Sequence, residues 1–230
     1  MLFTTRWLLY QKHDYPGRCY DFFAHHPPLA YDEPIPLTDV LERNGLDDAL
    51  RCLRATTVPC DSFARLLAAD FAEHVLPLFE TAHPDNHAPR QAIEVARRFA
   101  RGEATNEERH DARQNAAAAA YTAYAAAKAA AAAYAAADEA AKAADAAFNK
   151  VAYARAKAAA SAAIAAAFYA SAEAADYSAY APRAAADYAA KAAFYGAAAA
   201  SHDATAAHAA ADAEREWQTE HFREALLAHN

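Results

Sequence analysis

Alanine dominates the second half of this 230-residue chain and limits what that half can fold into. Between Ala116 and Ala213, 58 of 98 residues are alanine, with one glycine, Gly196, and one proline, Pro182. Alanine has the highest intrinsic helix propensity, so windows this long are expected to be helical with little help from tertiary packing. A single helix over residues 105–181 would exceed roughly 100 Å at 1.5 Å per residue, so the tract must fold back on itself.

The remaining residues of the tract predict where its helices begin and end. Thr105 and Glu108 form a T-x-x-E capping box, which predicts the start of a long helix. Breaks are expected near Asn149, at residues 178–182 and at residues 196–201, because helix-disfavouring residues gather there. A last amphipathic helix is expected over residues 203–227.

The first hundred residues have the ordinary signals of a packed helical protein. Short helical patterns alternate with Pro and Gly, and the strongest apolar stripe predicts a core helix through Phe63, Leu67 and Phe71. Pro77 is expected to kink this helix or to end its regular hydrogen bonding one turn early. The sequence therefore predicts an all-α protein: an irregular N-terminal helical domain, residues 1–104, is followed by a long antiparallel alanine-rich helical bundle, residues 105–230, in one continuous fold unit.

Charge and composition exclude several classes of function. A formal net charge of −8 argues against a sequence-independent nucleic-acid binder, which needs a concentrated basic face. Charged residues interrupt the alanine tract every few positions, so no membrane span is expected. The three cysteines are an odd number without a C-x-x-C pair, which is typical of a reducing compartment. A cytoplasmic protein is predicted.

Catalytic and cofactor motifs do not occur in the sequence. Four isolated glycines cannot make a Walker loop, a G-x-G-x-x-G turn or a G-x-S-x-G elbow, and the eleven histidines include no H-E-x-x-H motif. We therefore expect a non-enzymatic protein with no catalytic residues, no cofactor and no metal.

Two groups of side chains are candidates for binding a ligand or a partner. The arginines of the first group could bind a phosphate or carboxylate, or could form an ion-paired surface. They are Arg97 and Arg101, which share one helical stripe with Arg90, Arg98 beside that stripe, and Arg51 and Arg54 further upstream. The tyrosines of the second group could line a pocket for an aromatic or nucleotide-like ligand, or could simply fill the core; they are Tyr121, Tyr124, Tyr177, Tyr180, Tyr188 and Tyr195.

Three stretches of the chain resemble one protein family. Residues 36–55, 71–80 and 92–105, with the terminal Glu216-Trp-Gln-Thr219 and the alanine tract, resemble the alanine-rich immunity proteins of the immunity-five-like group, found in bacteria and their phages. The resemblance implies a non-catalytic protein that protects a cell from a toxin or acts in phage–host conflict. The chain differs from the family pattern at Arg51, where a tryptophan is common, and in its use of tyrosines within the tract.

Two hypotheses of function follow, from different classes. The first is a binding protein that neutralises a protein toxin or a bacterial defence effector by stoichiometric association. The alternative is a phage-type sponge that sequesters a small nucleotide immune signal in an Arg- and Tyr-lined pocket between subunits of a homo-oligomer. A scaffold or oligomerising coil is a third, weaker interpretation. Neither nucleic acid nor membrane is expected as a partner.

Overall fold

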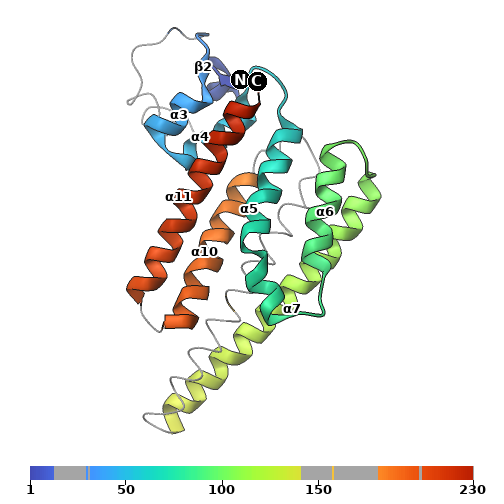
Figure 1. Cartoon of the computed structure of the whole chain (residues 1–230), viewed down its shortest axis with the longest axis vertical. Helices are drawn as coiled ribbons and strands as arrows, with labels where there is room; N and C mark the ends of the chain where they lie inside the picture. The colour runs from blue at the N-terminus through green and yellow to red at the C-terminus, as the bar shows by residue number, and fades with distance from the viewer. Residues whose placement is uncertain (13–29, 31, 141–156, 158–180, 202–203, 230) are drawn as a thin grey trace.

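A computed structural model describes residues 1–12, 30, 32–140, 157, 181–201 and 204–229 (Figure 1). Helices make up nearly all of its regular structure, so the predicted all-α class is confirmed. The helical elements, in chain order, are α1 (Arg6–Lys12), α3 (Leu37–Asn44), α4 (Leu46–Cys52), the 3₁₀ turn η1 (Leu53–Ala55), α5 (Asp61–Ala82), α6 (Ala88–Ala100), α7 (Asn106–Ala140), α10 (Ala181–Ser201) and α11 (Ala204–Ala228).

Short extended segments hold the N-terminus against the helices. Strand β1 (Phe3–Thr4) pairs antiparallel with β2 (Ile35–Pro36), with Thr4 opposite Ile35. The Thr4 hydroxyl donates to the carbonyl of Ala55 at 2.6 Å, which fastens this small sheet to η1. The Met1 ammonium donates to the carbonyl of His229 at 2.9 Å, so the two chain ends lie together (Figure 1). A positive charge at this end of α11 complements its helix dipole.

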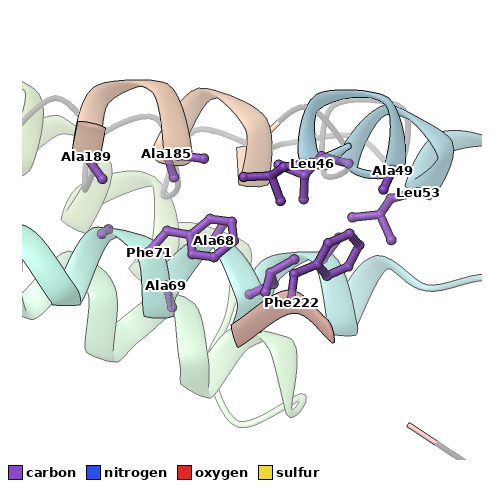
Figure 2. Close-up of a cluster of buried hydrophobic side chains, with 14 of the residues drawn as sticks. Leu46, Ala49, Leu53, Ala68, Ala69, Phe71, Ala185, Ala189 and Phe222 are labelled. Carbon is purple, nitrogen blue, oxygen red and sulfur yellow. The ribbon is translucent and has the colours of Figure 1, made fainter. Parts of the chain in front are cut away.

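Helix α5 is central to the bundle. It packs against α10 on one side and α6 on the other; α11 packs on α10, and α7 packs on α6 (Figure 1). Figure 2 shows Phe71 of α5 opposite Ala185 and Ala189 of α10, with Phe222 of α11 beside Leu53 and Leu46. Small alanine side chains let helix axes approach closely, and the aromatic rings supply the bulk that alanine lacks. The buried core draws residues from both compositional halves of the chain.

The beginning of α7 agrees with its prediction. The Thr105 N–H donates to Glu108 Oε2 at 2.7 Å, and the Glu108 N–H donates to Thr105 Oγ1 at 3.1 Å. These two reciprocal bonds are the capping box, and they satisfy two backbone donors at the helix start. The hydrogen bond from the Thr105 backbone N–H is the main cause of a lowered pKa at Glu108, and the hydrogen bond from the Arg98 side chain lowers this pKa further.

A glycine and a proline lie inside two of the helices. Helix α10 passes through Gly196 and ends at Ser201, and α11 begins at Ala204, so the break expected over residues 196–201 falls at the end of that range. A Cβ at Gly196 would lie 3.1 Å from Leu78 Cδ2, so glycine permits a close approach of α10 to α5, which offsets its low helix propensity. Helix α5 continues past Pro77 to Ala82, so the alternative in which it ends one turn early is wrong; buried Leu76 and Phe79 hold its last turns on the core. The break expected near Asn149 lies outside the described residues. None of the described helices has the length and hydropathy of a membrane span.

Candidate functional site: an aromatic and histidine cluster on α5 and α11

Trp217 of α11 is stacked between two histidine rings. The ring centroids of Trp217 and His74 of α5 are 3.6 Å apart with planes within 8°, and those of Trp217 and His221 are 5.0 Å apart within 10°. The edge of the Phe71 ring completes the contact at 6.2 Å. Residues three and four apart share one face of a helix, so Trp217 and His221 both reach α5. Parallel aromatic stacking of this kind adds to the stabilisation from burial.

Each histidine is held by a carboxylate on the opposite helix. His74 Nδ1 lies 2.7 Å from Glu214 Oε2, and His221 Nε2 lies 2.9 Å from Asp70 Oδ2. An ionised carboxylate only accepts hydrogen bonds, so these ring nitrogens are the donors. Both pairs join α5 to α11: in the first, a histidine of α5 donates to a carboxylate of α11, and in the second, a histidine of α11 donates to a carboxylate of α5. They fix the orientation of both rings against Trp217.

Glu214 is buried, with 5% of its surface exposed. Its second oxygen, Oε1, accepts a hydrogen bond from Gln218 Nε2 at 2.8 Å. Gln218 is fully buried, and the same nitrogen donates to the carbonyl of Ala186 on α10 at 3.1 Å. A buried carboxylate is costly unless donors satisfy it, and here His74 and Gln218 do so. The cluster is therefore tied to a third helix.

Arg97 extends the cluster to α6. Its Nη2 lies 2.6 Å from Asp70 Oδ1 and 2.6 Å from Glu73 Oε2. Burial disfavours the charged guanidinium, but the hydrogen bonds to Glu73 and Asp70 outweigh burial and raise the pKa of Arg97. Asp70 consequently accepts hydrogen bonds from α6 and α11 at once. We call the set Asp70, His74, Arg97, Glu214, Trp217, Gln218 and His221 the Trp217 cluster.

The Trp217 cluster is partly open to solvent. The His74 and His221 side chains are 41% and 30% exposed, and Trp217 is half-buried. The cluster thus presents pre-oriented rings and hydrogen-bonding groups at the surface, which suits contact with another molecule. Among the described residues, no group of His, Cys, Asp and Glu side chains could hold a metal ion.

The arginine candidates are ion-paired within the chain. Arg98 Nη2 lies 3.0 Å from Glu108 Oε1, and Arg101 Nε lies 2.9 Å from Glu103 Oε2. Arg97 is engaged in the Trp217 cluster. An incoming phosphate would compete with these carboxylates for the guanidinium groups. The carboxylates that contact Arg97 lie on α5 and the one that contacts Arg98 lies on α7, whereas Glu103 follows Arg101 by two residues in the turn after α6.

The upstream arginines lie on different elements from that stripe. Arg51 on α4 is 3.8 Å from Asp48 Oδ1 and has 19% of its side chain exposed. Arg54 is half-buried on η1. The contact of Arg51 with Asp48 agrees with the ion-paired alternative for this arginine.

The described tyrosines lie on two helices. Tyr121 and Tyr124 on α7 are 75% and 41% exposed, and the Lys157 ammonium lies 5.2 Å from the Tyr124 ring centroid. Tyr188 on α10 packs against the core, and Tyr195 contacts Phe194 edge-on at 5.3 Å. Tyr177 and Tyr180 lie outside the described residues.

Sequence reasoning missed most of the Trp217 cluster, although its signals were present. Glu214, Trp217, Gln218 and His221 have i, i+3, i+4, i+7 spacing, which places them on one helical face. Asp70 and His74 have i, i+4 spacing on α5. Which two faces meet could not be read from spacing alone. The cluster does join the stretches 71–80, 92–105 and 216–219 that carry the family resemblance.

The fold and this cluster define an all-α bundle protein with a pre-oriented, partly exposed aromatic site. Residues 64–154 match the sequence model of the Imm-5 like putative immunity protein family, which confirms the resemblance and supports an immunity-type role. The matched range contains Asp70, His74 and Arg97 of the cluster. Comparisons with curated proteins and with solved structures gave no significant match.

Proposed function

We propose that this protein protects a cell or a phage by binding a toxin or a bacterial defence component and blocking it stoichiometrically, without turnover. The observation that carries the proposal is the match of residues 64–154 to an immunity protein family. A blocking protein needs a rigid surface and no reaction centre.

The geometry of the Trp217 cluster supports this role. Its rings are already oriented by the Asp70 and Glu214 carboxylates, so little side-chain entropy would be lost when a partner docks. Tryptophan is also enriched among the residues that dominate binding energy at protein interfaces.

The nucleotide-sponge alternative has less support from the structure. Buried phosphates need paired cations, and Arg97, Arg98 and Arg101 already contact carboxylates of the same chain. In a sponge, the phosphates of the ligand would compete with those carboxylates for the arginines.

The test is purification from cells with active toxin or defence systems, followed by native mass spectrometry and a cell-protection assay. We expect a protein to co-purify in a fixed ratio and protection to rise with the amount of this protein. Arg98→Glu with Arg101→Glu is the matched control, because both side chains are exposed and lie outside the Trp217 cluster; it should retain protection. Stoichiometric binding of cyclic di- or trinucleotides by calorimetry, abolished by that double reversal, would contradict the proposal and favour the sponge.

A further inference from the structure

The outer face of α11 carries a line of carboxylates. Asp212, Glu216, Glu220 and Glu224 recur at every fourth position, and all four are exposed. At 1.5 Å per residue the line is about 18 Å long. Helix α11 lies at an edge of the bundle, with α10 on its inner side (Figure 1). We call these four residues the acidic stripe.

Folding does not account for the acidic stripe. Like charges four residues apart on a helix repel each other, and the stripe contains three such pairs in succession. Glu224 also lies near the C-terminus of α11, where the helix dipole disfavours anions. Lysine at alternate positions would have removed both costs. The stripe therefore costs the isolated fold about 0.2–0.5 kcal/mol for each like-charge pair.

The two arginines of α11 leave most of this charge in place. Arg223 pairs with Glu220, and the hydrogen bond from that carboxylate raises the pKa of Arg223. Arg215 is directed to Asp187 and Asp47 on neighbouring elements. With five carboxylates and two arginines, α11 has a formal charge of −3.

The acidic stripe lies beside the Trp217 cluster. Glu216 precedes Trp217, and Glu220 lies one turn further along the same side of the helix. The surface thus combines a half-buried aromatic side chain, Trp217, with exposed carboxylates beside it. Protein interfaces commonly have this composition, with aromatic residues in the buried core and charged residues in the rim.

We propose that this face of α11, the acidic stripe together with Trp217, is the docking surface for a protein partner with a lysine- or arginine-rich face. The inference rests on the proposed function and specifies the chemistry of the partner. Charge complementarity is the argument: a chain of net charge −8 with a concentrated acidic face attracts and orients a basic surface.

The experiment uses a deca-arginine peptide as the probe and Trp217 fluorescence as the signal. Trp7 and Trp217 are the two tryptophans of the chain, so Trp7→Phe leaves Trp217 as the reporter. We expect saturable binding of deca-arginine and none of deca-glutamate. Glu216→Lys, Glu220→Lys and Glu224→Lys together should weaken binding at least tenfold.

A matched control separates the stripe from net charge. Asp85→Lys, Glu94→Lys and Asp111→Lys together also take the formal charge from −8 to −2, because each reversal replaces −1 with +1. All three positions are exposed and lie outside α11. This variant should bind within about threefold of its parent. Equal weakening by both triple variants, or comparable binding of deca-glutamate, would overturn the inference.

A milder variant keeps the test valid if the triple reversal fails to fold. Glu216→Gln with Glu224→Gln leaves the Glu220–Arg223 pair intact and should still weaken deca-arginine binding at least threefold; an unchanged affinity would refute the docking surface. In the protection assay, loss of protection on Tyr121→Ala but not on the stripe variants would also overturn the inference while leaving the proposed function standing. If the unaltered protein neither co-purifies with a protein nor protects, the proposed function fails, whatever the peptide result.

Discussion

Replacing Trp217 by alanine should destabilise the fold by about 2–3 kcal/mol. A fully buried tryptophan costs about 3–5 kcal/mol when cut to alanine, and Trp217 is only partly buried, so the expected loss lies at or just below the bottom of that range. The change also removes the stack on His74, at 3.6 Å, and on His221, at 5.0 Å. For a domain of 150–250 residues this free-energy loss corresponds to a melting temperature lowered by about 4–12 °C.

Urea unfolding followed by far-ultraviolet circular dichroism measures this loss, since the substitution removes one of the two tryptophan fluorophores. Trp217→Phe keeps an aromatic ring in the stack and should lose less than half as much stability. Trp7→Ala is the matched control, because Trp7 is more exposed than Trp217, at 50%, and lies outside the stack; this change should alter stability by about 0.5–1 kcal/mol at most. A Trp217→Ala protein within about 0.5 kcal/mol of the unaltered chain would refute the assignment of the stack as a structural contact.

Two further predictions concern the core and the response to acid. Leu67→Ala and Phe71→Ala should each cost about 2–5 kcal/mol in urea unfolding, because both side chains are almost fully buried on α5; a loss below 1 kcal/mol would contradict that assignment. The hydrogen bonds from Arg90 lower the pKa of Glu80 below its ordinary value of 4.5, so this pair stabilises the fold above pH 4.5 and loses its effect as the pH falls through the lowered pKa. Glu80→Gln should therefore cost about 0.5–1 kcal/mol at pH 7, with the difference shrinking below pH 4, in unfolding measured across this range; a difference that grows on acidification would contradict the pairing.

The predicted and observed helices agree where the signal was local. The capping box at Thr105 and Glu108 appears as expected because it depends only on residues three apart. At Gly196 and Pro77 propensity alone favours an interruption, yet α10 passes through Gly196 and α5 continues past Pro77. The cost is about 1 kcal/mol for glycine and about 3 kcal/mol for proline, whereas burial of one large side chain contributes about 1.5–3 kcal/mol, so the two buried side chains Leu76 and Phe79 together offset the cost of Pro77.

The sequence by itself determined the all-α class, the position of the core stripe on α5 and the resemblance to an immunity family. Alanine content, apolar spacing and short motifs are properties of neighbouring residues, so they need no knowledge of the fold. Only the tertiary structure decided that Arg97 faces carboxylates of α5, that Arg98 faces Glu108 of α7, and that His74 meets Trp217 across more than 140 positions of the chain. The helical period predicts which residues share a face of one helix. Which face of another helix packs against it depends on how alanine surfaces and aromatic rings fit together, and that is a property of the whole bundle.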